Sequence, residues 1–107
     1  MAVPLLDLTL QYKRLQSKIE PKILNVLSSG QYILGPEVSE CEKELAQYVG
    51  VPYCYTVSNG TIALIMALQA IGIKPGDEVI TTSFSFFATA EAISILGAKP
   101  IFIDIDE

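Results

Sequence analysis

Residues that could hold an anion stand together in Val57-Ser58-Asn59-Gly60-Thr61, directly before an apolar run over 62–71. We expect a strand to end here and a helix to begin. A small-residue loop of that kind directs free backbone N–H groups and the positive end of a helix dipole at one point, which suits a phosphate. Gly60 would let the backbone come close, and Thr61 would add a hydroxyl donor.

The same residue types are common at the start of any helix, so a plain N-cap by Ser58 or Asn59 is the alternative interpretation. The stretch has no P-loop lysine and no G-x-G-x-x-G pattern. Both absences argue against a Walker site and against a dinucleotide site.

A second candidate is Thr82-Ser83-Phe84-Ser85-Phe86-Phe87, where aromatic residues stand among hydroxyl residues at the expected end of a strand. An aromatic ring there could stack on a planar ligand, with core packing as the alternative. Asp104, Asp106 and Glu107 follow a further strand and could bind a metal or exchange protons. We interpret them as a solvated strand exit and expect no metal site. From the abrupt end there we expect the chain to be incomplete.

Composition narrows the class of protein. The chain has 107 residues, enough for about one small domain, and its net charge of -5 argues against a nucleic-acid partner. It has no histidine, the commonest general base. Cys41 and Cys54 lack metal or redox spacing and are expected to be small buried residues. Residues 1–10 lack a secretory pattern and 62–71 is too short to span a membrane, so we expect a cytoplasmic protein without a membrane partner.

Apolar spacing predicts a helix over 9–29, which Pro21 should kink or split, and a second helix from Pro36 to Gly50. The loop over 31–35 carries an exposed Tyr32. The acidic residues of the second helix are expected to form a solvated face: Glu37, Glu40, Glu42 and Glu44.

After residue 52 the pattern changes to strands at 53–57, 78–82 and 100–104, with helices at 60–71 and 85–96 between them. Residues 74–77 read as a type II turn. The helix over 60–71 is apolar almost all round and should be deeply buried. This order predicts an α/β fold with a mostly parallel, doubly wound sheet. Ligands of such sheets bind beyond the carboxyl ends of the strands, where both candidate loops would lie.

Several segments together resemble the N-terminal part of the DegT/DnrJ/EryC1/StrS aminotransferases, which are pyridoxal-phosphate enzymes that aminate nucleotide-linked keto sugars. The resemblance rests on Pro4-Leu5-Leu6-Asp7-Leu8, Gln11-Tyr12, 29–38, Ser58-Asn59-Gly60-Thr61, Ala63-Leu64, Pro75-Gly76-Asp77-Glu78-Val79-Ile80, Gly97-Ala98-Lys99-Pro100 and Asp104-Ile105-Asp106. It implies a truncated fold-type-I aminotransferase large domain, with 1–52 as a helical lead-in and 53–107 as β-α-β-α-β.

The resemblance also implies roles for single residues. Asn59, Gly60 and Thr61 would bind the phosphate of pyridoxal 5'-phosphate, and Phe86 would stack on its ring. The helical lead-in and the Tyr32 loop would contact a second subunit in a homodimer. Glutamate is the implied amino donor, and a nucleotide-linked keto sugar used in amino-sugar biosynthesis is the implied acceptor.

The family's Schiff-base lysine, its carboxylate partner for the pyridine nitrogen and its small C-terminal domain correspond to sequence beyond Glu107. We therefore expect this chain alone to be inactive, marginally stable and prone to associate, since the strand at 53–57 would lie apart from the other two. One alternative is a short non-catalytic module for phosphate binding or subunit contact. Another is a fragment of an unrelated doubly wound enzyme. The sugar, the carbon aminated and the choice between transamination and dehydration stay open.

Overall fold

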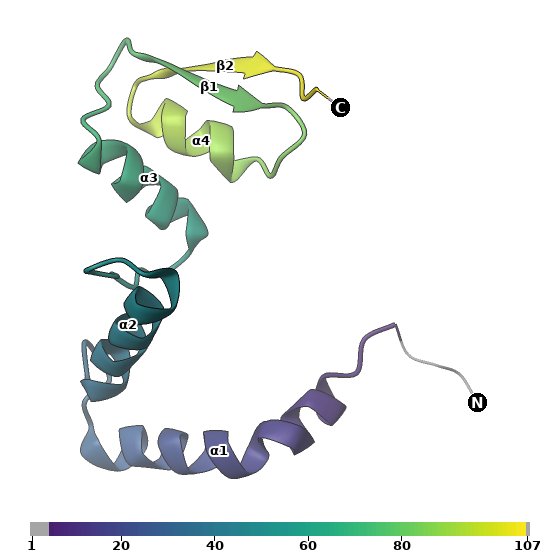
Figure 1. Ribbon diagram of the computed structural model, residues 1–107, viewed down its shortest axis with the longest axis vertical. Helices are drawn as coiled ribbons and strands as arrows, with labels where there is room; N and C mark the ends of the chain where they lie inside the picture. Colours follow the sequence, from purple (N-terminus) through teal and green to yellow (C-terminus); the bar gives the residue numbers. More distant parts are fainter. Residues whose placement is uncertain (1–4, 107) are drawn as a thin grey trace. The chain divides into compact units, whose positions relative to one another are not determined.

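The computed structural model describes residues 5–106. The expectations for Pro4 and Glu107 lie outside the described residues. The chain divides into two compact units, Met1–Tyr55 and Thr56–Glu107. Figure 1 shows helices alone in the first unit, and helices together with a pair of strands in the second.

The first unit begins with helix α1, Leu8–Ser29, close to the predicted bounds. Asp7 caps its start by accepting the N–H of Leu10 at 3.0 Å. Gly30 ends it with a φ of 68°, where its N–H donates to the carbonyl of Val26. Pro21 lies inside α1 without splitting it, and Figure 1 shows a single helix that changes direction along its length.

Helix α2, Pro36–Val49, starts and stops as predicted, because Pro36 opens it and Gly50, at a φ of 78°, ends it. Gly35 before it is buried, and a Cβ there would come 2.4 Å from the carbonyl oxygen of Gln31. Only glycine therefore fits at this turn between the helices.

The acidic side of α2 is not simply a solvated face. The Nζ of Lys22 on α1 lies 3.1 Å from a carboxylate oxygen of Glu37 and 3.1 Å from one of Glu40. Cys41 on the same helix is exposed, so the expectation that it would be buried is wrong, and Cys54 is half-buried.

The second unit contains helix α3, Gly60–Ala70, strand β1, Glu78–Thr82, helix α4, Ala88–Ile95, and strand β2, Lys99–Ile103. The strands pair in parallel, with Glu78 opposite Lys99 and Thr82 opposite Ile103. The predicted parallel crossover through a helix is therefore confirmed. Helix α4 begins at Ala88 rather than at Ser85. In the irregular loop before it, the N–H of Phe84 donates to Oγ1 of Thr82 and the hydroxyl of Ser85 is hydrogen-bonded to that of Thr89.

The turn before β1 forms as predicted. Gly76 takes a φ of 92°, and the N–H of Asp77 donates to the carbonyl of Lys74 at 3.1 Å. The N–H of Gly76 also donates to the carbonyl of Gly97 at 2.9 Å, which joins this turn to the end of α4.

Two predictions about the second half are wrong. Residues 53–57 are not a strand, because a strand needs a hydrogen-bonded neighbour and the one sheet among the described residues pairs β1 only with β2. Helix α3 has no buried residue, and Leu64 and Met66 are 40% and 49% exposed. Helix α3 packs on α4, and no further described element of the second unit covers its other faces.

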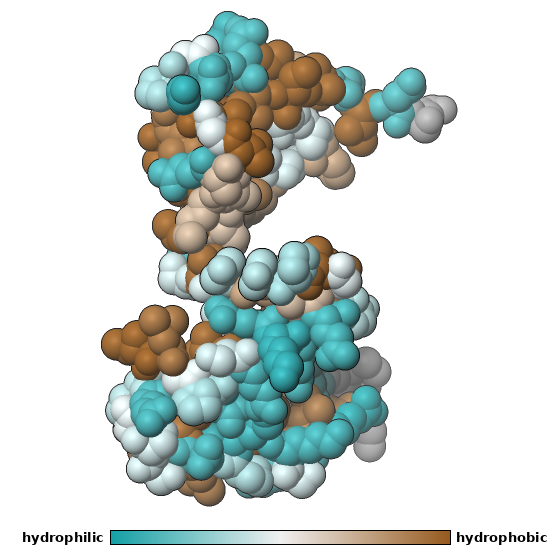
Figure 2. Space-filling model, turned by 60° about the vertical axis from the view of Figure 1, so that its left-hand side comes forward, coloured by the Kyte–Doolittle hydropathy of each residue, from teal (hydrophilic) through white to brown (hydrophobic). Residues whose placement is uncertain are grey.

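The core of the second unit is centred on α4. Ala88, Ala92, Ile93 and Ala98 are buried, with Ile93 only 2% exposed. Many other large apolar side chains of the unit are exposed, among them Ile80, Phe84 and Phe86, and brown areas cover much of the upper part of Figure 2. The buried set is mostly alanine, so this core is small.

Candidate functional site

All of the predicted site residues line one hollow of the second unit, about 750 Å³ in volume. Asn59, Gly60 and Thr61 come from the start of α3, and Phe86 comes from the loop between β1 and α4. The structure therefore brings the two candidate loops together, although 53–57 is not a strand, because α3 packs on α4.

The start of α3 shows which groups are available to a ligand. The Oδ1 of Asn59 accepts the N–H of Ile62 at 3.0 Å, and its carbonyl accepts the N–H of Ala63 at 3.1 Å. The first N–H groups of a helix have no acceptor inside the helix. In α3 the N–H groups of Gly60 and Thr61 are therefore available to a ligand. Asn59 is thus the N-cap, and the donors suited to an anion are the N–H groups of the two residues that follow it, Gly60 and Thr61.

Gly60 is not required by the fold. A Cβ built at this position meets no atom within 4 Å, and the backbone is not in the left-handed region. Glycine leaves the space that a Cβ would occupy open to a ligand.

Phe86 presents its ring to solvent, not to the core. Its side chain is 80% exposed, and Phe84 and Phe87 are 86% and 72% exposed. The alternative of core packing for these aromatics is therefore wrong within the described residues. An exposed ring beside an anion-binding helix start is suited to stack on a planar ligand that carries a phosphate.

The hollow has no ionisable side chain among its described lining residues. Any attraction of the hollow for an anion must therefore come from the backbone at the start of α3. Nor do the described residues contain a group of three histidine, cysteine, aspartate or glutamate side chains that could hold a metal. Asp104 instead accepts the N–H of Ile105 at 2.9 Å.

A family model for the DegT/DnrJ/EryC1/StrS aminotransferase family matches residues 13–107. The chain belongs to this family. The resemblance seen in the sequence is thereby confirmed, and the fold of the chain is that of part of a family member.

Two similar proteins are also aminotransferases of nucleotide-linked sugars. The chain is 51% identical over 104 residues to a UDP-2-acetamido-2-deoxy-3-oxo-D-glucuronate aminotransferase of Pseudomonas aeruginosa, covering 97% of the chain and 29% of that relative. It is 41% identical over 105 residues to a dTDP-3-amino-3,4,6-trideoxy-alpha-D-glucose transaminase of Streptomyces venezuelae, covering 98% of the chain and 28% of that relative. The chain thus spans less than a third of the length of these relatives.

Solved structures give the same picture. A DegT/DnrJ/EryC1/StrS aminotransferase from Brucella abortus superposes with a TM-score of 0.91 and 44% identity, over 98% of this chain and 28% of that one. NtdA from Bacillus subtilis, solved with bound cofactor PMP, gives a TM-score of 0.76 and 39% identity over 78% of this chain and 19% of that one.

Not all of the residues that line the 750 Å³ hollow were predicted from the sequence. The hollow is also lined by Ala63, Leu64, Ala67, Ala88 and Thr89. The first three follow Gly60 at spacings of three, four and seven residues, which put them on one helix face. That spacing could have predicted them, whereas Thr89 depends on where α4 begins.

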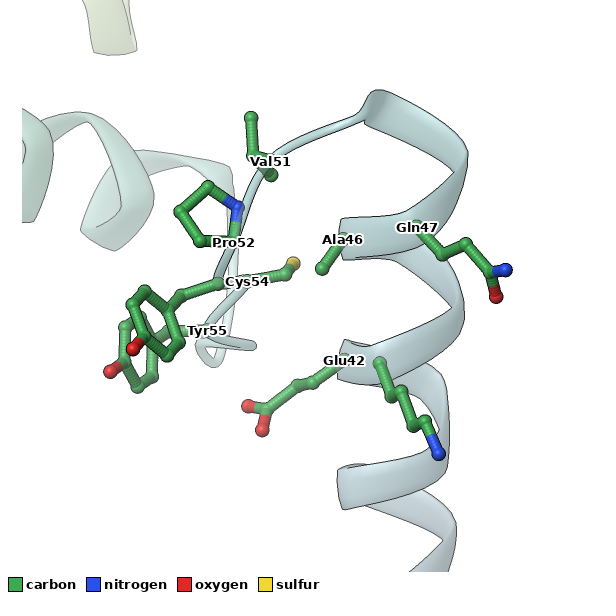
Figure 3. Close-up of a pocket in the computed structure, with 9 residues that line it drawn as sticks. Glu42, Ala46, Gln47, Val51, Pro52, Cys54 and Tyr55 are labelled. Atoms are coloured by element: carbon green, nitrogen blue, oxygen red, sulfur yellow. The ribbon is translucent and has the colours of Figure 1, made fainter.

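The first unit has a separate hollow of about 500 Å³ between α2 and the segment 51–55. The sulfur of Cys54 points toward Ala46 on α2, while Tyr55 extends away from the helix (Figure 3). None of the predicted site residues lines it, and it plays no part in the site described above. No described helix is both long and apolar enough to cross a membrane.

Proposed function

We propose that the hollow of the second unit is half of a pyridoxal 5'-phosphate site. The N–H groups of Gly60 and Thr61 and the Thr61 hydroxyl would hold the phosphate, and Phe86 would stack on the ring. The observation that supports this most is the placing of uncapped N–H groups and an exposed aromatic ring on the walls of one hollow.

The residues present fit that group. A phosphate is favoured by the backbone at a helix start, and a pyridine ring by an aromatic face. When bound, the cofactor would supply an aldehyde carbon that takes up and returns an amino group, and an electron-withdrawing ring attached to that carbon. The chain's own residues would bind and orient it, with Asn59 fixing the helix start by capping.

The described lining of the hollow contains no lysine. Binding without covalent attachment is therefore what this chain can contribute. In a longer family protein a lysine from another part of the chain would complete the site. The alternative of a non-catalytic phosphate-binding module rests on the same observation, and reading the gene beyond Glu107 separates the two. A lysine in a serine-rich segment, preceded by an aspartate, supports the enzyme, and a stop codon supports the module.

For the whole protein we propose transfer of an amino group, from glutamate, to a nucleotide-linked keto sugar. The two relatives named above, which are aminotransferases of nucleotide-linked sugars, support this substrate class. We also propose a homodimer formed through α1, α2 and the Tyr32 loop. Tyr32, Ile33 and Leu34 are 64%, 87% and 79% exposed, which suits a protein interface.

Binding is tested by titrating pyridoxamine 5'-phosphate into the 107-residue chain and recording the NMR chemical shifts of the backbone amides. This form of the cofactor is bound without a covalent bond to lysine. We expect Gly60, Thr61 and Phe86 to shift, and Thr61→Val to weaken binding about tenfold, because one hydrogen bond to a charged group is lost. Gly60→Ala should weaken binding without loss of stability. Thr9→Val, on exposed α1, is the control. Shifts confined to other residues would refute the site.

Catalytic incompleteness has its own test. Pyridoxal 5'-phosphate mixed with the chain should separate from it on gel filtration, taking the visible absorbance with it. Absorbance that stays with the protein would show that one of its own lysines bonds the cofactor, contrary to the proposal.

A further inference from the structure

We propose that Thr89 is a positioning residue for Phe86. Its side-chain and main-chain hydrogen bonds would hold the aromatic ring at the wall of the hollow. The inference rests on the proposed function, because it concerns the pose in which Phe86 meets the cofactor ring.

Phe86 needs such support. It lies in the irregular connection between β1 and α4, and its side chain is 80% exposed. Packing therefore does little to fix the ring. A ring that moves freely loses conformational entropy when a ligand stacks on it, and this loss weakens binding.

Thr89 is hydrogen-bonded to the backbone of Phe86 and to the side chain of the residue before it. Its Oγ1 lies 3.1 Å from the Oγ of Ser85, the residue before Phe86. Its N–H donates to the carbonyl of Phe86 at 3.1 Å. The loop is tied at its other end as well, where the N–H of Phe84 donates to Oγ1 of Thr82 at 3.1 Å.

The position of Thr89 fits this role. Thr89 is half-buried and lines the 750 Å³ hollow together with Phe86. It also lines a neighbouring hollow of about 270 Å³, this time with Ser85 and Phe86. The Ser85–Thr89 bond therefore stands in the wall between the two hollows, and Phe86 belongs to the same wall.

The side-chain bond can be removed separately from the main-chain bond. Any residue at position 89 keeps the N–H that reaches the Phe86 carbonyl, since this bond belongs to the first turn of the helix. Thr89→Val keeps the branched shape and loses only the hydroxyl, whereas Thr89→Ser keeps the hydroxyl. Ser85→Ala removes the same bond from the exposed side.

A double-mutant cycle tests the proposal by titrating pyridoxamine 5'-phosphate into the 107-residue chain. We expect Thr89→Val to raise the Kd about two- to tenfold, within the range for residues that act together. In a Phe86→Ala background the same change should have no further effect. Thr89→Ser should restore binding. Ser94→Ala is the control on α4, because its hydroxyl donates to Ala90 away from the hollow.

Inorganic phosphate separates positioning from general damage. Its donors lie on α3, so its affinity should be equal in the wild type and in Thr89→Val. The proposal is overturned if Thr89→Val and Phe86→Ala have additive effects, or if phosphate binding falls as much as pyridoxamine phosphate binding.

Failure of the proposed function would be seen differently, as absence of pyridoxamine phosphate binding to the wild type. The role of Thr89 would then be decided without ligand, from nitrogen-15 relaxation at the Phe86 amide. Greater motion in Thr89→Val and Ser85→Ala, but not in Thr89→Ser, supports positioning. Equal motion in all of them overturns it.

Discussion

Thr61 and Phe86 line the same hollow, although Thr61 starts α3 and Phe86 precedes α4. They meet because α3 packs on α4. Thr61 sits in the first turn of a helix whose cap is intact, whereas Phe86 depends on a loop tied by hydroxyl groups. The two walls of the hollow are therefore held by different interactions, an N-cap at the start of α3 and hydroxyl hydrogen bonds around the Phe86 loop.

Replacing Asn59 by alanine should destabilise the second unit by about 0.5–2 kcal/mol, because the N–H of Ile62 loses its side-chain acceptor. Chemical denaturation followed by circular dichroism measures the change. Asn59→Asp keeps a capping oxygen and should retain stability, yet its negative charge should weaken phosphate binding beside Gly60 and Thr61. Equal stability of Asn59→Ala and the wild type would show that the cap does not matter.

Replacing Ile93 by alanine should cost about 2–5 kcal/mol, because this side chain fills the centre of a small core and would leave a cavity. Ile95 on the same helix is 59% exposed and provides the matched control. Ile95→Ala should change stability by less than about 0.5 kcal/mol. Equal losses from the two replacements would mean that α4 does not pack as described.

The pH response of α1 should depend on Tyr12 and Glu20. The Tyr12 hydroxyl donates to the Glu20 carboxylate, and Gln16 donates to it at 2.9 Å. These bonds lower the pKa of Glu20 below its ordinary 4.5, and the bond to Glu20 raises that of Tyr12 above 10.0. The hydrogen bonds to the Glu20 carboxylate stabilise the folded chain above pH 4.5. This stabilisation is lost as the pH falls through the lower pKa that Glu20 has in the folded chain. The stabilisation from the Tyr12 hydroxyl is present below pH 10.0. It is lost as the pH rises through the higher pKa that Tyr12 has in the folded chain.

An NMR titration of the Glu20 carboxyl checks this. In Tyr12→Phe the pKa should rise toward 4.5, since the Tyr12 bond is the largest cause of its lowering. Tyr48→Phe, at an 89% exposed position on α2, should leave the Glu20 pKa unchanged. A Glu20 pKa that ignores Tyr12→Phe would rule out the bond in solution.

Local signals predicted the helices well. Pro36 and Gly50 mark the ends of α2, and Asn59 marks the start of α3, because capping depends on residues within one turn. The candidate site was predictable for the same reason, since each loop follows a recognisable break in pattern. The start of α4 was less predictable, because it depends on hydrogen bonds among Ser85, Thr89 and the backbone.

Two predictions that needed distant partners failed, although the parallel pairing of β1 with β2 was confirmed. The residues at 53–57 have strand composition, but the one sheet among the described residues consists of β1 and β2 alone. The apolar surface of α3 predicts burial, but only a packing partner could supply it, and α4 covers one side. Composition indicates what a segment requires, and the rest of the fold decides whether that requirement is met.

The exposed apolar surface of the second unit should make the chain associate. Strands β1 and β2 have no further strand beside them among the described residues, and Ile80 in the middle of β1 is 66% exposed. Open strand edges and apolar faces favour pairing with other chains. Sedimentation at increasing protein concentration should therefore show oligomers, and thermal unfolding should depend on concentration.

Charge placed on this sheet should oppose association. Ile80→Lys should shift the chain toward monomer at equal concentration. Association through the sheet would bury the new ammonium group without a partner, which is costly. Tyr48→Lys adds the same charge to the first unit and should leave the oligomers in place if they form through the sheet. A monomer at micromolar concentration with a single cooperative thermal transition would show instead that the small core around Ile93 suffices by itself.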